Sequence, residues 1–484
     1  MDEADADARY LKDFKNQIRN GEAEVVLLLH EGADPNVRDT VAVNRGFWEE
    51  VEFLLKRMLR PPSASTTLPR SALAFAVQAK NTAIATALLK AGANDVNAEV
   101  ETHSGHRYTL VNYSAYSGNL EITRELCAHG ADLRLNSSRD SILQSALGGR
   151  ADISIDLIYS EKNALKQPEI VRRTEIFHLL EAKEVTYKAN SGEGYALLLI
   201  AAAHGLPGVT RELLAAGVPP DAKPMTYDAR EDSPLDVAVY NDDLPLVQLL
   251  LQYGASTRRA DADSPMLYVR SPQVAKLLLA HGADLHAVCR SGKFEGRNAL
   301  DFACTRGDAQ AVTFLIEHGF NVNPAGEYGG PLCAAVGYGG IETVRVMLKH
   351  GAKVGPNSPG EGALAEAIAG MNDDIALLLL RYGAAVNTKE DPPLTAAAEQ
   401  DDLEMARELL LRGAKANADK GKALLAACES CDEDLVEMLL EHGANPNVRS
   451  WDGSTAIQIA RYSADPPSDA DGIIALLKRY GVKR

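Results

Sequence analysis

The stretch Leu439-Leu440-Glu441-His442-Gly443-Ala444-Asn445-Pro446-Asn447 ends a leucine-rich helix in a small turn. Leu28-Leu29-His30-Glu31-Gly32-Ala33-Asp34-Pro35-Asn36 shows the same pattern near the other end of the chain. The turn glycines are Gly32, Gly92, Gly130, Gly217, Gly254, Gly282, Gly319, Gly351, Gly383, Gly413, Gly443 and Gly481. Most neighbouring glycines are 28 to 38 residues apart, which indicates one structural repeat of about 33 residues per step. Because stacked repeats pack mainly on their neighbours, a chain of 484 residues built this way needs no single large core.

The segment 108–132 shows how one repeat is built. Two short helices are expected to meet at Gly118-Asn119. Ile122 and Leu126 recur at helical spacing, so they should bury the second helix against its neighbours. Gly130 follows that helix, where a left-handed residue commonly ends a helix and glycine adopts this conformation without a steric penalty. The sequence therefore predicts that each repeat is a pair of helices followed by a glycine turn.

The Leu-Leu-x-x-Gly-Ala turns, together with Gly118-Asn119-Leu120-Glu121-Ile122, resemble the ankyrin-repeat family over nearly the whole chain. The resemblance implies an all-α solenoid of about 13–14 helix-turn-helix units connected by hairpin fingers. None of the eleven histidines occupies the Thr-Pro-Leu-His position of the family's first helix. At that position the chain has Asp236, Asp301, Cys333 or Thr395, which indicates naturally diverged repeats.

Irregular spacing marks places where the array should change. From Gly130 to the degenerate turn at Lys183 there are 53 residues, so one unit carries an insertion. In the unit that ends at Gly282, Pro265 to Ser271 replaces a full first helix. We predict an N-terminal part, residues 1–190, with irregular and inserted units, and a C-terminal part of repeats, residues 191–484.

The charge balance bears on possible partners. The chain has 67 acidic and 50 basic side chains and a net charge of -17, which disfavours a nucleic-acid ligand because phosphate binding needs clustered lysine and arginine. The first residues lack the features of a signal peptide, and no apolar run reaches 18 residues. The six cysteines share no spacing that suggests bridges. We therefore expect a monomer in the cytoplasm or nucleus, with no membrane contact.

Motifs for catalysis, cofactors and metals are not found in the sequence. It contains no phosphate-binding loop, zinc-binding HExxH helix or GxSxG nucleophile elbow. Acidic pairs such as Asp242-Asp243 and Asp401-Asp402 fall at the starts of second helices, where carboxylates cap backbone N–H groups. Histidines before the turn glycines are one repeat apart, too far for shared metal coordination. We predict neither a cofactor nor a metal site.

Two groups of residues are candidates for partner binding. The ankyrin resemblance implies that partners contact the fingers and the ends of the first helices. Counting back from the turn glycines places five residues there: Tyr116, His204, Tyr240, Arg306 and Tyr338. The finger around residues 288–297 adds base and aromatic side chains, which suit an acidic partner: Arg290, Lys293, Phe294 and Arg297. Tyrosine and arginine are enriched in interface hot spots, although a surface tyrosine also simply covers apolar neighbours.

The sequence favours a non-catalytic scaffold or adaptor that binds a protein or peptide partner through the concave groove and fingers. The alternative is an enzyme whose active site is built in the groove. Its candidate groups are His103, His106, Arg107 and Tyr108 in one finger, with Tyr113 and His204 behind them. Histidine can serve as a general acid or base near pH 7, but the same residues suit a solvated hairpin.

Overall fold

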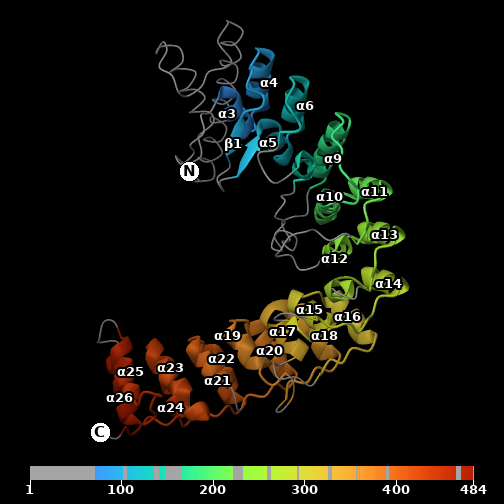
Figure 1. Cartoon of the computed structure of the whole chain (residues 1–484). Coiled ribbons are helices and arrows are strands. Elements are labelled where there is room, and N and C mark those ends of the chain that lie inside the picture. The colour runs from blue at the N-terminus through green and yellow to red at the C-terminus, as the bar shows by residue number, and fades with distance from the viewer. Residues whose placement is uncertain are drawn as a thin grey trace, which may run out of the picture. The chain divides into compact units, whose positions relative to one another are not determined.

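The computed structural model describes residues 71–101, 106–135, 141–148, 166–221, 233–258, 263–290, 294–324, 330–355, 358, 360–388, 392–464 and 470–482 (Figure 1). Contacts group the chain into two compact units, Met1–Ser256 and Thr257–Arg484. The boundary expected at residue 190 falls inside the first of these units. Each unit is a stack of short helices, so the predicted all-α solenoid is confirmed.

The first unit contains helix pairs in which each first helix packs on its second helix. The helices are α3 (Ala72–Gln78), α4 (Thr82–Lys90), α5 (Leu110–Tyr116), α6 (Leu120–Ala128), α7 (Ile142–Ala146), α9 (Gln167–Glu181), α10 (Gly192–Ala203), α11 (Pro207–Ala215), α12 (Pro234–Tyr240) and α13 (Leu244–Gln252). One finger forms an antiparallel hairpin of β1 (Glu99–Glu101) and β2 (Arg107–Thr109), with Val100 opposite Tyr108.

The second unit continues the same pattern of pairs. Its helices are η2 (Pro265–Tyr268), α14 (Pro272–Ala280), α15 (Ala299–Arg306), α16 (Ala309–Glu317), α17 (Gly330–Ala334), η4 (Ala335–Gly339), α18 (Ile341–Lys349), α19 (Ala363–Ala369), α20 (Asp373–Arg381), α21 (Pro393–Glu399), α22 (Leu403–Leu411), η5 (Ala418–Gly421), α23 (Lys422–Ser430), α24 (Glu433–Glu441), α25 (Ala456–Ser463) and α26 (Ala470–Arg479). The first helices pack in chain order, α15 on η4, then α19, α21, α23 and α25. The first helices of this unit therefore form one layer, in which equivalent residues of neighbouring helices are one repeat apart.

At the turn positions, glycine is favoured by the backbone conformation alone. All of them except Gly32, which lies outside the described residues, have φ between +83° and +97°. A Cβ built on any of these glycines would meet no atom within 4 Å. The left-handed turn predicted for Gly130 is thus confirmed, with φ of +83°.

Acidic residues cap several second helices, as predicted, whereas α20 has Asn372 at this position and no side-chain cap. Asp243, Asp402 and Asp432 each accept a hydrogen bond from a backbone N–H three residues on, at 3.0 Å. Asp242 and Asp401 precede two of these caps and hold φ values of +53° and +58°. The pairs are therefore helix-starting devices, in which one residue makes the turn and the other caps the helix.

Asparagines link several neighbouring fingers. Asn417 donates to the carbonyl of Gly443 at 2.7 Å and accepts from the N–H of Asn445 at 2.7 Å. Asn387 makes the same pair of bonds to Gly413 and Lys415. Because these bonds satisfy groups at the ends of second helices, they fix the spacing of neighbouring repeats.

The predicted shortened unit is present. Pro265–Tyr268 forms only a short 3-10 turn, η2, where other repeats have a full first helix. Ser264 caps this turn, since its hydroxyl accepts from the N–H of Met266 at 3.3 Å. The turn leaves backbone carbonyls near its end without the helical partners that a longer helix would provide.

The cysteines are free thiols, as the sequence indicated. Burial, followed by the Glu366 carboxylate, raises the pKa of Cys333 to about 12. Burial also raises the pKa of Cys428 to about 12, with Cys431 as a second cause. Thiols held in the protonated form are poor nucleophiles and poor metal ligands, so Cys333 and Cys428 serve as packing residues.

The helices are short throughout the described part of the chain. The longest among those given above is α9, with 15 residues. Within this part, no helix combines the length and apolar character needed to span a lipid bilayer.

Candidate partner-binding surface

Tyr338 is the predicted site residue that the structure presents most fully. It lies on η4, a single π-helical turn, and its side chain is 78% exposed. The next residue but one, Gly340, has φ of +78° and ψ of +170°, a conformation essentially reserved for glycine. Single π turns occur often at functional sites. Here the turn places an aromatic ring at the end of a first helix.

Arg306, predicted to face a partner, is held by contacts within its own unit. Its guanidinium donates to the carbonyls of Val269 at 2.7 Å and Leu267 at 3.4 Å, and to Asp308 at 2.7 Å. Arg270 reaches the other oxygen of Asp308 at 3.1 Å. The Arg306 side chain is only 14% exposed. Its donors satisfy the carbonyls at the end of the shortened helix η2.

The basic-aromatic finger is partly described. Val288 and Asn298 form an isolated antiparallel bridge at its base. Phe294 lies edge-on to Phe302, with ring centroids 5.7 Å apart, and the Arg297 guanidinium lies 5.4 Å from the Phe294 ring centre. Arg290 is exposed two residues after Val288, and Lys293 lies outside the described residues. The finger therefore presents two exposed arginines beside a half-buried aromatic ring.

The candidates in the first unit are less exposed. Tyr116 stacks on Tyr108 with ring centroids 5.5 Å apart, and its carbonyl accepts from Arg173 at 3.3 Å. His204 is buried at the end of α10, with 9% of its surface exposed. Tyr240 is half-buried at the end of α12. These side chains contribute mainly to packing between repeats.

Trp451 is the most exposed aromatic residue of the described chain, and it was not among the predicted site residues. Its side chain is 100% exposed. It lies at the tip of the finger between α24 and α25, above a bridge between Arg449 and Thr455. Asp452 fixes this tip by accepting hydrogen bonds from Ser450, from the Ser454 N–H at 3.0 Å and from the Ser454 hydroxyl at 3.0 Å.

The hydrogen bonds at this tip also act on the Asp452 carboxyl. They lower its pKa below the ordinary value, and the Ser450 bond has the largest effect. Tyr462, at the end of α25 in the same repeat, is also almost fully exposed. The signal in the sequence is a tryptophan placed inside the turn Ser450-Trp451-Asp452-Gly453-Ser454. A short polar turn cannot bury a tryptophan, so the ring must point away from its own finger.

Two residues of the enzyme alternative, Tyr108 and Tyr113, belong to a packed aromatic cluster. Tyr108 is buried, and its ring contacts those of Tyr113 and Tyr116. The Tyr113 hydroxyl donates to the carbonyl of Gln78 at 3.3 Å. Burial, and then Tyr116, raises the pKa of Tyr113 above its ordinary value, which does not suit it for proton transfer near pH 7. His103 lies outside the described residues.

Histidines before the turn glycines make a recurring local bond. In His129, His281, His318 and His442, the ring Nδ1 lies 2.7–3.0 Å from the carbonyl four residues earlier in the same helix. Because a carbonyl only accepts, Nδ1 carries the proton in each of them. These rings cap their own helix ends.

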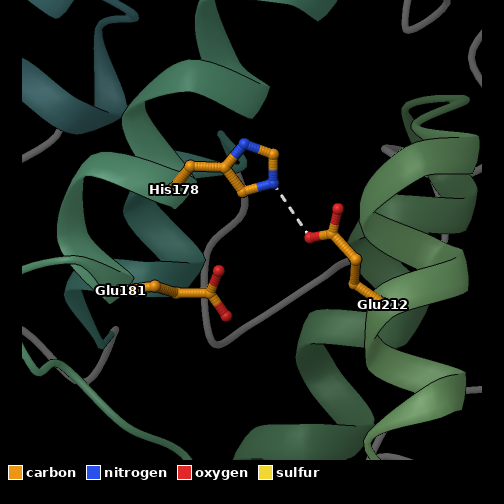
Figure 2. A group of neighbouring side chains, drawn as sticks. All are labelled: His178, Glu181 and Glu212. Atoms are coloured by element: carbon orange, nitrogen blue, oxygen red, sulfur yellow. Dashed lines mark hydrogen bonds and ion pairs between the residues drawn. The ribbon is translucent and has the colours of Figure 1, made fainter.

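A different group of ionisable residues joins two repeats of the first unit. His178 and Glu181 lie on the last turn of α9, and Glu212 lies on α11. Figure 2 shows the three side chains turned toward the same space, with His178 Nε2 2.9 Å from Glu212 Oε2. Burial and then the Glu212 carboxylate raise the pKa of Glu181, while His178 opposes this effect.

Models of a known family match the chain between residues 230 and 450. "Ankyrin repeats (3 copies)" matches residues 266–358 and 363–450, and "Ankyrin repeat" matches residues 230–262. These parts of the chain are thus similar to ankyrin repeats. The expectation that such repeats cover nearly the whole chain was somewhat too broad, because these matches begin at residue 230.

Two known proteins resemble parts of this chain. Ankyrin repeat and SOCS box protein 14 of Mus musculus is 32% identical over 97 residues, which are 20% of this chain and 16% of that relative. The chain thus spans only a small part of that protein's length. The crystal structure of the human ASB11 ankyrin repeat domain is 20% identical, with a TM-score of 0.36, and the match covers 51% of this chain and 98% of that one.

Proposed function

We propose that this protein is a non-catalytic scaffold that binds a protein or peptide partner through the fingers and first-helix ends of its second unit. The observation that carries the proposal is the fully exposed Trp451 on a hydrogen-bonded fingertip. An exposed tryptophan ring is unfavourable in water, and tryptophan is the residue type most enriched in interface hot spots. Because the tip is already ordered, a partner would gain this contact with little loss of conformational entropy.

Tyr338 extends the proposed surface to a second repeat. Its ring is exposed at the end of a first helix, the position at which ankyrin-repeat proteins commonly contact partners. Tyrosine offers a large contact area with few rotatable bonds. We assign Arg306, His204 and Tyr116 a supporting role, because their side chains are largely occupied inside the repeats.

The finger 288–298 is proposed to contact an acidic segment of the partner. Arg290 and Arg297 are exposed, while the chain as a whole is acidic, so this finger would attract negative charge selectively. Phe294 supplies an apolar surface beside the Arg297 guanidinium. The finger therefore joins charge attraction to apolar contact.

The proposed cellular setting is a reducing one. All six cysteines are free, which suits the cytoplasm or nucleus, where thiols stay reduced. The acidic net charge of -17 supports a protein partner in preference to nucleic acid. We propose that the array acts as a monomer.

Trp451→Ala is expected to weaken partner binding by at least about tenfold, because a hot-spot aromatic commonly contributes 2 kcal/mol or more. The tagged full chain is used to capture its partner from cells of the source organism, and the captured protein is then titrated against purified wild-type and variant chains. The matched control is Leu411→Ala, which removes an exposed apolar side chain on the second helix α22. Equal affinities for wild type and Trp451→Ala would contradict the proposal.

Charge reversal tests the finger separately. The double variant Arg290→Glu and Arg297→Glu is expected to slow association with the partner and to weaken binding most strongly at low salt. Surface plasmon resonance at two ionic strengths measures this effect. The control reverses Arg345 to Glu, since Arg345 is a half-exposed arginine on the second helix α18. A salt dependence that matches wild type would exclude an acidic segment at the finger.

A further inference from the structure

We infer that His178, Glu181 and Glu212 form a binding site for a first-row transition-metal ion, with Zn²⁺ as the best match. The three residues offer one imidazole nitrogen and two carboxylate oxygens, and these atoms lie within 4.8 Å of one another. Metal–ligand bonds of about 2 Å place the ligands of one ion roughly 3–3.5 Å apart. His178 Nε2 and Glu212 Oε2 now share a hydrogen bond at 2.9 Å, so they need to move apart only slightly to bind one ion.

The backbone brings these ligands together without strain. His178 and Glu181 are three residues apart on the last turn of α9, so both point from the same face of that helix. Glu212 lies one repeat further on, on α11, and faces the same space (Figure 2). The glutamate side chains carry three rotatable bonds each, and small rotations close the remaining distance to an ion.

The charges of the group favour a divalent cation. Two carboxylates, Glu181 and Glu212, share the site with one imidazole, His178, and their ligand atoms lie within 4.8 Å of one another. A cation of charge +2 would balance the pair of acids better than a single imidazolium.

The mixture of ligands selects the class of metal. Imidazole suits zinc, copper, iron and nickel, whereas calcium and magnesium prefer all-oxygen sites. Three protein ligands leave at least one position of a tetrahedral ion for water. The side chains of His178 and Glu212 are 46% and 47% exposed, so the ion has a direct path from solvent.

Metal binding at this site would stabilise the contact between two repeats. Repeat arrays are stabilised by interfaces between neighbouring units, and this site would tie α9 to α11 across one such interface. Binding to the folded state alone would raise the stability of this joint in proportion to the logarithm of the zinc concentration. The site does not depend on the proposed partner, because Trp451 and Tyr338 belong to the other compact unit.

The test is a titration of the metal-free full chain, prepared by dialysis against EDTA, with ZnCl₂ by isothermal calorimetry. Wild type is expected to bind one Zn²⁺ with an affinity in the micromolar range, and zinc should raise its melting temperature. His178→Ala and Glu212→Gln should each weaken zinc binding by at least tenfold. Both variants should also lose the zinc-induced rise in melting temperature. MgCl₂ should give no binding in the same range.

The matched control is His129→Ala, which removes another exposed imidazole near a glutamate, Glu125, at 3.9 Å. It should leave the high-affinity site intact. Circular dichroism of the metal-free variants confirms that each one is folded before titration. Equal zinc affinity and stoichiometry in wild type and His178→Ala would overturn the assignment, and so would an equal loss in His129→Ala.

Discussion

Gly339→Ala is expected to lower the free energy of unfolding by about 3 kcal/mol or more. A Cβ at this position would lie 2.0 Å from the carbonyl oxygen of Cys304, on the preceding first helix. A Cβ on Gly307 would in turn lie 2.4 Å from the carbonyl oxygen of Gly339. The two backbones are therefore in direct contact, and neither has a flexible side chain that can move aside. To admit a methyl group, α15 and η4 must separate.

Urea-induced unfolding, followed by circular dichroism, measures this effect. The control is Gly443→Ala, where a Cβ meets no atom within 4 Å and only the positive φ of +85° opposes the change. That variant should lose about 1–2 kcal/mol. If Gly339→Ala lost no more stability than Gly443→Ala, the close approach between the two repeats would not exist in solution.

The repeating parts of the fold were predictable because local chemistry determines them. A left-handed helix end favours glycine whatever the surrounding contacts are. The positive φ values of Gly130 and Gly443 could therefore be predicted from the neighbouring sequence alone. The capping carboxylates of Asp243 and Asp402 depend on N–H groups only three residues away. Short-range rules of this kind apply equally to every repeat.

Contacts between repeats were not predictable at the same level. The sequence indicated the shortened helix at Pro265, but it did not show that Arg306 compensates for it from 37 residues further on. Position within the repeat alone suggested a surface role for Arg306. Its side chain turns inward because Val269 leaves a carbonyl that needs a donor.

The candidate site shows the same limit. The exposure of Tyr338 was predictable by counting from the turn glycine, because it follows from the position of the residue in the repeat. Trp451 was not among the predicted residues, although its turn sequence contains the signal. Glu212 joins His178 only after neighbouring repeats have stacked, and no motif in the sequence marks that pair.

Arg306→Ala is expected to lower the free energy of unfolding by about 2–4 kcal/mol. The variant removes two donors to the carbonyls of Leu267 and Val269 and one to Asp308. The Asp308 side chain is only 9% exposed. In the variant, one of its carboxylate oxygens would keep the ion pair with Arg270. The other oxygen would lose its charged partner at a position with little access to water. Removal of one member of a buried, hydrogen-bonded pair is more damaging than loss of a surface ion pair.

Arg306→Lys keeps the positive charge but has too few fixed donors to reach three acceptors, so it should recover less than half of the loss. Arg297→Ala, an exposed arginine of the neighbouring finger, should change stability by less than about 0.5 kcal/mol. Chemical denaturation of the three variants gives the comparison, and titration with the captured partner separates folding from binding. Since the Arg306 side chain is mostly enclosed, folded Arg306→Ala should bind with nearly the wild-type affinity. Strong loss of binding with unchanged stability would instead place Arg306 on the partner surface.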